Sequence, residues 1–149
     1  MTFDEFAASC GPRLRAALVA AYGVDIGLDA AADALAYGWE HWRRVGVMAN
    51  PAGYLYRVGQ TAARRSRRDE IVLPLPPPLE LPDFEPRLVP ALKSLTESQR
   101  VVIMLVHGHG WSQVDVAEVL EISHATVRTH LARGLSRLQL LLEDREHVE

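Results

Sequence analysis

Six of the nine prolines in this 149-residue chain lie within residues 71–86, in the run Ile-Val-Leu-Pro-Leu-Pro-Pro-Pro-Leu-Glu-Leu-Pro-Asp-Phe-Glu-Pro. Proline fixes φ and has no amide hydrogen to donate, so this run can form neither a helix nor a central strand. It favours an extended, semi-rigid linker. The sequence therefore predicts two small domains, residues 1–70 and 88–149, joined by a proline-rich linker over residues 71–87. Each half has a thin core, which hints at an assembly subunit.

In the first half, apolar residues recur at the three- and four-residue spacing of helices. Residues 3–22 are expected to form one or two helices, with Gly11-Pro12 marking a break or a helix start. A turn is expected over residues 23–27. Asp29 is then expected to cap a helix that runs to about Arg44. Trp39 and Trp42 on this helix are expected to lie in the core.

A further helix is expected to begin at Asn50-Pro51, which has N-cap and first-turn chemistry, and to end near Asp69. One face of it is basic, because five arginines crowd into a short stretch, at Arg57, Arg64, Arg65, Arg67 and Arg68. The guanidinium fork suits phosphates and base edges, although a solvated helix face is the alternative explanation. The formal net charge of −3 argues against a protein that coats nucleic acid non-specifically.

In the second half, the strongest local signal is a pair of short helices between Trp111 and Leu138. Thr96 or Ser98 is expected to cap a preceding helix that stops at Gly108-His109-Gly110. Ser112 and Ser123 are expected to cap the two helices of the pair. No stretch alternates as a strand does, so the whole chain is predicted to be all-α. The second helix of the pair has an apolar stripe formed by Val127, Leu131, Leu135, Leu138 and Leu142.

The opposite face of this helix carries small polar residues and arginines but no acid in its first turns, a pattern typical of a helix that enters the major groove. Arg128 and Arg133 can reach guanine edges or phosphates. Thr126 or Thr129 can contact a thymine methyl group or a phosphate. The sequence thus predicts a helix-turn-helix, with an ordinary helical hairpin as the alternative.

Other classes of protein receive little support. The single cysteine, Cys10, excludes an internal disulfide framework, and neither a secretory segment nor a membrane-spanning run is visible, so a cytoplasmic location is expected. No phosphate loop, nucleophile elbow or paired carboxylates are found, so we expect no enzyme and no cofactor. We also expect no metal site, because four histidines lack the spacing and partners of a ligand set. They are His107, His109, His124 and His130.

Two blocks of the sequence resemble the sigma-70 family, in particular sigma factors of the extracytoplasmic-function type. The first is Leu95-Thr-Glu-Ser-Gln-Arg100 followed by the segment from Trp111 to Leu131, which is similar to sigma region 4 and would also fit the C-terminal domain of LuxR-type response regulators. The second is Asp33-Ala-Leu-Ala-Tyr-Gly-Trp-Glu-His-Trp42, followed by Asn50-Pro-Ala-Gly-Tyr-Leu-Tyr-Arg-Val58 and the arginine cluster. This block resembles sigma region 2 and not a phosphoreceiver, and it favours the sigma family.

The resemblance implies a promoter-recognition subunit that binds core RNA polymerase, opens the −10 element and recognises the −35 element as duplex. The residues that it places at the −35 element are Thr126, Arg128, Thr129, His130 and Arg133. Those placed at the −10 element, in the loop of residues 48–50 and the helix after it, are Asn50, Tyr54, Arg57, Arg64 and Arg68. Those placed against the polymerase are Asp33, Tyr37 and Glu40. An anti-sigma factor is a further partner that the resemblance implies.

The chain departs from the family pattern at three places. Leu35-Ala36-Tyr37 replaces the polar residues usual on the helix that docks on polymerase. Glu121 stands where the turn commonly has glycine, and Gly134-Leu135 stands where basic residues are often found. Two alternatives remain open: a stand-alone regulator that binds its operator without polymerase, or a sigma-like protein that acts mainly through protein partners.

Overall fold

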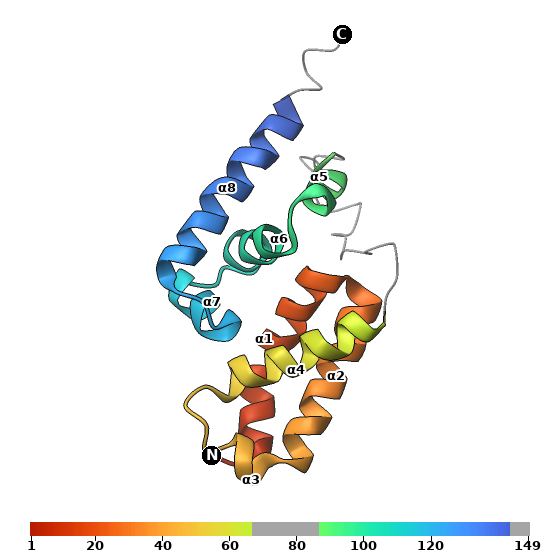
Figure 1. The fold of residues 1–149 in the computed structure, drawn as a ribbon, viewed down its shortest axis with the longest axis vertical. Helices are drawn as coiled ribbons and strands as arrows, with labels where there is room; N and C mark the ends of the chain where they lie inside the picture. The colour runs from red at the N-terminus through yellow and green to blue at the C-terminus, as the bar shows by residue number, and fades with distance from the viewer. Residues whose placement is uncertain (67–86, 144–149) are drawn as a thin grey trace.

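The computed structural model describes residues 1–66 and 87–143, and every regular element in these two ranges is a helix. The predicted all-α class is confirmed. Helices α1, α2, α3 and α4 form one end of an elongated molecule, and α5, α6, α7 and α8 form the other (Figure 1). The predicted linker of residues 71–87 lies outside the described residues except for Arg87, and the predicted boundary stays a prediction. Among the described residues, no helix has the length and apolarity needed to cross a membrane.

Helix α1 (Phe3–Tyr22) is a single helix that continues through Pro12. Its start is fixed by a reciprocal capping box, in which the Thr2 side chain accepts from the Glu5 amide and the Glu5 carboxylate accepts from the Thr2 amide. It ends at Gly23, whose φ of 89° suits glycine.

Helix α2 (Val24–Glu40) begins directly after Gly23, so the predicted turn over residues 23–27 and the predicted cap at Asp29 are wrong. The reason is tertiary packing, because α2 folds back along α1 with Gly27 against it. A Cβ at this glycine would lie 2.5 Å from Val19 Cα and 2.7 Å from the Leu18 carbonyl oxygen. Only a residue without a side chain permits this approach. Gly27 is therefore a helix–helix contact position within α2 and not part of a turn.

Trp39, near the end of α2, and Trp42, just after it, differ in burial. Trp42, at the start of the short helix α3 (Trp42–Val45), is half-buried against Phe3 and Phe6, with ring centroids 5.6 and 5.0 Å apart. Trp39 was expected in the core, but 67% of its surface is exposed. The inward positions of α2 are held instead by small residues, namely Gly27, Ala30, Ala31, Ala34 and Gly38.

Helix α4 (Pro51–Arg65) crosses α1 and α2, and its predicted start is confirmed. The Asn50 side chain accepts from the Gly53 amide at 3.0 Å, and Pro51 occupies the first turn. Leu55 and Tyr56 point into the core. The expected continuation of this helix to Asp69 extends beyond the described residues.

In the second half, α5 (Leu88–Ser94) is followed by α6 (Glu97–Ile103), whose start Thr96 fixes in a capping box with Gln99. Helix α6 runs into a π-helical turn, η1 (Met104–Gly108), and the chain then turns through Gly110 at a φ of 71°. Helices α7 (Gln113–Leu120) and α8 (His124–Glu143) follow, and α8 packs on α5, α6 and α7.

The apolar stripe of α8 differs from the prediction at one position. Val127 and Leu138 are buried as expected, but Leu135 is 40% exposed and Gly134 is buried in its place. A Cβ at Gly134 would lie 2.5 Å from Ile103 Cδ1. The glycine therefore lets α8 approach α6 closely, a packing role that partly compensates for its low helix propensity.

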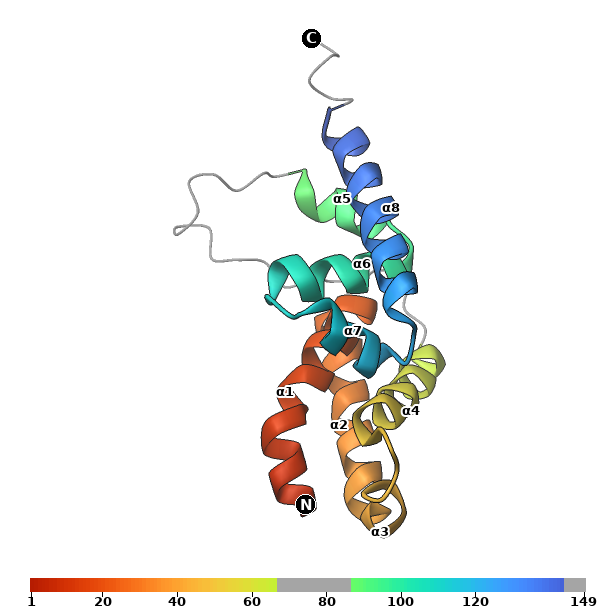
Figure 2. The same ribbon diagram turned by 90° about the vertical axis from the view of Figure 1, so that its left-hand side faces the viewer.

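The two halves share one core across their junction. Buried residues of α1 and α4 belong to the same apolar cluster as Val101, Val102, Val116 and Val119 of the second half. Arg100, only 3% exposed, reaches from α6 to the last turn of α1 and donates to the carbonyls of Ala20 at 2.9 Å and Ala21 at 2.5 Å. A cation there satisfies free carbonyls at the negative end of a helix. Figure 2 shows α6 and α7 lying against α1 and α4.

Candidate nucleic-acid interface

Helices α7 and α8 form a compact helix-turn-helix. The Ser112 hydroxyl accepts from the Asp115 amide at 3.1 Å, and the Ser123 hydroxyl accepts from the Thr126 amide at 3.0 Å, so each helix has the cap that the sequence predicted. Glu121 makes the turn between them in the left-handed conformation, with φ 54° and ψ 46°. The first turn of α8 has no acidic residue, so no carboxylate there opposes a phosphate at the positive end of the helix dipole.

The exposed face of α8 has a small centre and basic edges. Arg128 and Arg133 are both exposed, and their separation of five residues places them about 140° apart around the helix. Ala132 and Ser136 lie between them on the same exposed face. Small side chains at the centre allow close approach to a groove floor, while the arginines can reach toward its two walls. Thr129 is exposed as well, and its hydroxyl donates to the Ala125 carbonyl.

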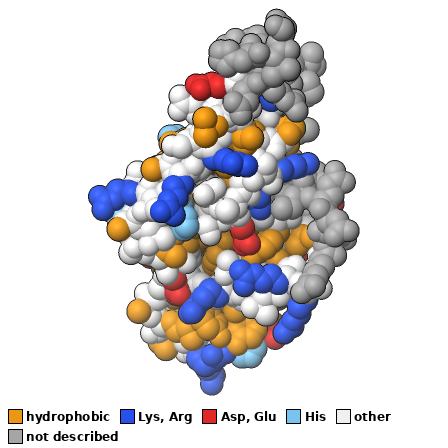
Figure 3. Space-filling model, turned by 45° about the horizontal axis from the view of Figure 1, so that its top comes forward, with side chains coloured by type: hydrophobic (Ala, Val, Ile, Leu, Met, Phe, Trp, Pro, Cys, Tyr) orange, Lys and Arg blue, Asp and Glu red, His pale blue; other side chains and the backbone are white. Residues whose placement is uncertain are grey.

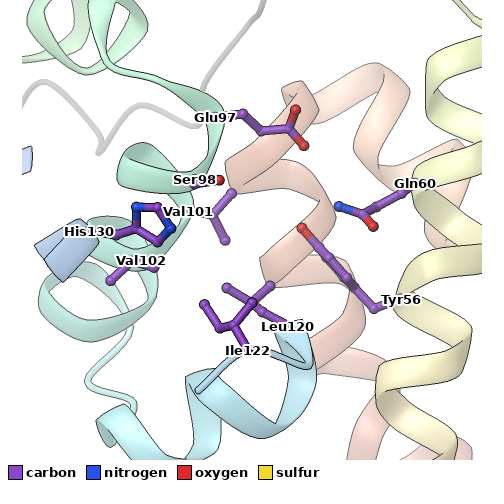
Figure 4. Close-up of a pocket in the computed structure, with 9 residues that line it drawn as sticks. All are labelled: Tyr56, Gln60, Glu97, Ser98, Val101, Val102, Leu120, Ile122 and His130. Carbon is purple, nitrogen blue, oxygen red and sulfur yellow. The ribbon is translucent and has the colours of Figure 1, made fainter. Parts of the chain in front are cut away.

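His130 is placed differently from the other residues predicted at the −35 element. It is half-buried and lines a small pocket of about 120 Å³ at the junction of the two halves. Tyr56 and Gln60 of α4 line the opposite side, as Figure 4 shows. Burial raises the pKa of Tyr56. The structure therefore separates His130 from Arg128 and Arg133.

Two of the residues predicted at the −10 element face the helix-turn-helix. The Asn50 amide donates to the Glu118 carbonyl at 2.6 Å, in addition to capping α4. Arg57 Nε lies 3.0 Å from Glu121 Oε2. Arg64 lies two turns after Arg57 on the same exposed face of α4, whereas Arg68 lies outside the described residues.

Tyr54, also predicted at the −10 element, belongs to a surface cluster of aromatic and basic side chains. Its hydroxyl lies 3.4 Å from both the Tyr37 hydroxyl and Arg44 Nη1, and Arg44 also donates to Tyr37. These hydrogen bonds, with Tyr37 the larger cause, lower the pKa of Tyr54. The Arg57 guanidinium lies 6.0 Å from the Tyr54 ring centroid. Aromatic rings beside arginines are the components of a single-strand binding surface.

This cluster changes the grouping predicted from the sequence. Tyr37 was expected on the polymerase-binding surface, yet its hydroxyl bonds with Tyr54 and Arg44. Arg44 was missed altogether. The available signal was that Arg44 stands next to the expected loop. Its partners Tyr37 and Tyr54 lie seven and ten residues away, too far for local sequence spacing to indicate the contact.

The other residues predicted against polymerase, Asp33 and Glu40, are exposed on α2 and lie seven residues apart, which places them on one face. An apolar strip borders this acidic edge, because Leu28 and Trp39 are exposed one third of a turn away. The exposed face of α2 thus joins an acidic edge to an apolar one. Trp39 is therefore a candidate for a protein contact, which the prediction of a core position had missed.

The charges suit a specific contact more than general nucleic-acid coating. Basic side chains are spread over the face shown in Figure 3, with acidic ones between them. Within residues 1–66 and 87–143, no group of three or more histidine, cysteine, aspartate or glutamate side chains is arranged to hold a metal ion.

In the described residues, α7 and α8 form a helix-turn-helix, a motif that many DNA-binding proteins share. Residues 87–138 match the family described as Sigma-70, region 4. A solved structure, the sigma factor RpoE from Bartonella quintana in complex with the anti-sigma factor NepR, superposes with a TM-score of 0.66 and 23% identity, covering 95% of this chain and 96% of that one. A search of curated proteins gave no significant match.

The comparisons support the resemblance to sigma factors at two levels. The second half matches region 4 by sequence, and the whole chain has the fold of a solved sigma factor. The family match covers the helix-turn-helix itself, so the LuxR alternative loses its support.

Proposed function

We propose that this protein is a promoter-recognition subunit of bacterial RNA polymerase. The observation that carries the proposal is the helix-turn-helix of α7 and α8, which lies within the region 4 match and exposes Arg128 and Arg133 on a face with a small centre. In this role α8 enters the major groove of the −35 element. Thr126 and Thr129 contribute polar contacts near the start of the helix.

The surface around Tyr54 receives the opened −10 strand. Arg57 and Arg64 follow the phosphates, and Tyr54 with Arg44 offers a stacking and cation–π surface to an unpaired base. Asn50 lies at the start of the same helix. Opening a base pair costs a few kcal/mol, which such contacts have to offset.

The outer face of α2 docks on core RNA polymerase. Asp33 and Glu40 supply charge, and Trp39 supplies the exposed aromatic anchor that protein interfaces often use. Tyr37 contributes at the edge of this face, next to the −10 surface. The fold shared with RpoE, whose solved complex contains an anti-sigma factor, makes an anti-sigma protein a second proposed partner.

The proposal is tested by measuring binding to promoter duplex with and without core RNA polymerase. We expect specific binding and transcript formation only when core enzyme is present. Operator binding by the free protein as a dimer would instead make it a stand-alone regulator. A fluorescently labelled promoter fragment and a run-off transcript give the two measurements.

Replacing both Arg57 and Arg64 with alanine is expected to lower open-complex formation by about a hundredfold or more, since contacts to charged groups contribute about 1.5–3 kcal/mol each. Polymerase binding should change little, because neither residue lies on α2. Permanganate reactivity of unpaired thymines measures opening, and co-purification measures docking. The charge-matched control is the double alanine variant of Arg15 and Lys93, both exposed and off α4. Equal losses of opening and docking would contradict the assignment.

A second candidate, a sigma-like protein that acts mainly through protein partners, is favoured by one observation. Asn50 and Arg57 contact the helix-turn-helix, so part of the proposed −10 surface is occupied within the protein. Under this alternative the protein binds an anti-sigma factor but supports no transcript with core enzyme. The transcription assay above separates the two candidates.

A further inference from the structure

Glu121 occupies a backbone position that disfavours its side chain. It is the one non-glycine residue of the described ranges with positive φ, at 54°, a conformation that glycine adopts more readily. Local geometry alone therefore favours glycine at the turn between α7 and α8. The contacts of the Glu121 side chain should therefore explain why glutamate stands at this position.

The Glu121 side chain lies across the start of α4. Its Oε2 atom is 3.0 Å from Arg57 Nε, and its Cγ and Oε1 atoms lie against Gly53, where a Cβ would come within 2.5 and 2.7 Å of them. Any side chain at position 53 would meet the glutamate. The carboxylate thus rests on the surface that Asn50 and Arg57 form.

Neighbouring contacts hold this arrangement in place. Asn50 donates to the Glu118 carbonyl at 2.6 Å, just before the turn. On the other side of α7, Arg13 Nη2 lies 3.6 Å from Asp115 Oδ2, and the Arg13 guanidinium lies 5.5 Å from the centre of the Trp111 ring. The turn is therefore positioned over α4 from both sides and does not depend on the ion pair alone.

A carboxylate on Arg57 resembles a nucleic-acid phosphate in charge and in hydrogen-bonding chemistry. Arginine binds both groups through the same fork of donors, and a carboxylate already bound to Nε leaves fewer of them for a phosphate. Its negative charge also repels an approaching strand. The Glu121 side chain is mostly covered while that of Arg57 is 59% exposed, so the arginine remains accessible to a competitor.

We propose that Glu121 is an internal competitor of nucleic acid, occupying Arg57 in the free protein and giving it up when single-stranded DNA binds. The inference rests on the proposed function of the α4 surface. It adds a regulatory role for the α7–α8 turn, because the Glu121 carboxylate restrains the proposed strand-binding surface until DNA displaces it from Arg57. Free protein should then bind single strands weakly, and Glu121 should be one cause of that weakness.

The test uses the full chain without polymerase and a fluorescein-labelled 12-nucleotide single-stranded DNA, measured by anisotropy at low salt. Glu121→Gln keeps the length of the side chain and removes its charge. We expect it to tighten DNA binding about two- to fivefold, the range that loss of an exposed ion pair allows. Glu121→Gly, which also relieves the backbone, should give at least the same gain. Thermal melting followed by circular dichroism checks that both variants fold.

Two controls make the result specific. Glu118→Gln removes the same charge three residues earlier, from a side chain outside these contacts, and should leave the affinity nearly unchanged. In an Arg57→Ala background, Glu121→Gln should no longer tighten binding, because the competitor has lost its target. An equal gain from Glu118→Gln, or an undiminished gain without Arg57, would show a general charge effect and overturn the proposal.

Failure of the inference is distinguishable from failure of the proposed function. Unchanged affinity in folded Glu121→Gln and Glu121→Gly, or no binding by any variant, overturns the competitor role of Glu121. The proposed function is judged separately, by transcription with core RNA polymerase. If the wild-type protein starts transcripts but Glu121→Gln binds DNA no better than the wild type does, the proposed function is retained and the competitor role of Glu121 is excluded.

Discussion

Gly27→Ala is expected to lower the free energy of unfolding by about 3 kcal/mol or more, the upper part of the range for overpacked sites. The added methyl group would meet Val19 Cα at 2.5 Å and the Leu18 carbonyl oxygen at 2.7 Å. These are backbone atoms, so no side-chain rotation can make room, and α1 and α2 must move apart. Since small domains are stable by only about 5–15 kcal/mol, this loss is a large part of the total.

Urea denaturation followed by circular dichroism gives the measurement, as a fall in the transition midpoint. The matched control is Gly11→Ala, also a buried helical glycine of the first half. A Cβ there has its nearest neighbour at 3.5 Å, in the flexible Arg15 side chain. This variant should be stabilised by about 0.5–1 kcal/mol, because alanine is the better helix former. An unchanged midpoint in Gly27→Ala would contradict the close approach of α1 and α2.

Local features of the fold were predictable from the sequence because they depend on neighbours within four residues. The caps at Asn50, Thr96, Ser112 and Ser123 need only one side chain and a nearby amide, and all four were anticipated. The fold class was predictable for a similar reason. Helical spacing is set within each segment, and no segment had the alternation of a strand.

The errors arose where contacts between helices override local preference. Asp29 is a sound cap by residue type, but packing of Gly27 on α1 extends the helix past it toward Gly23. Trp39 is apolar and large, so it was assigned to the core, yet the close α1–α2 approach leaves space only for glycine and alanine inside. Leu135 and Gly134 exchange roles in the same way, because α8 lies close to α6.

The candidate site was predictable as a set of residues but not as an arrangement. Arginines and threonines on the second helix of the helix-turn-helix follow from periodicity alone. The contacts of Asn50 and Arg57 with α7 and its turn join residues more than sixty positions apart, for which the sequence contains no local signal. The same holds for His130, which the junction of the two halves places in a pocket with Tyr56. These residues remain proposals for DNA contact.

The geometry of α8 predicts that Arg128 and Arg133 act together, so replacing both of them is the decisive test of the proposed DNA interface. Both side chains are exposed, about 140° apart around the helix, with small residues between them. A helix lying in the major groove with its small face toward the base edges would direct the two arginines to opposite sides of the groove. They act on different strands in that position, so their contributions should be nearly additive.

Replacing both arginines with alanine is therefore expected to weaken binding of polymerase holoenzyme to a −35 duplex by about 2–6 kcal/mol, or 1–3 kcal/mol for each. Stability should not change, since neither side chain is buried. The double alanine variant of Arg15 and Arg43 removes the same charge from exposed sites outside α8 and should bind nearly as wild type. The salt dependence assigns the contacts: phosphate partners lower the slope of log K against log salt by about one for each arginine, whereas a guanine partner relaxes sequence preference at one position. Wild-type affinity in the Arg128 and Arg133 variant would exclude α8 as the recognition helix.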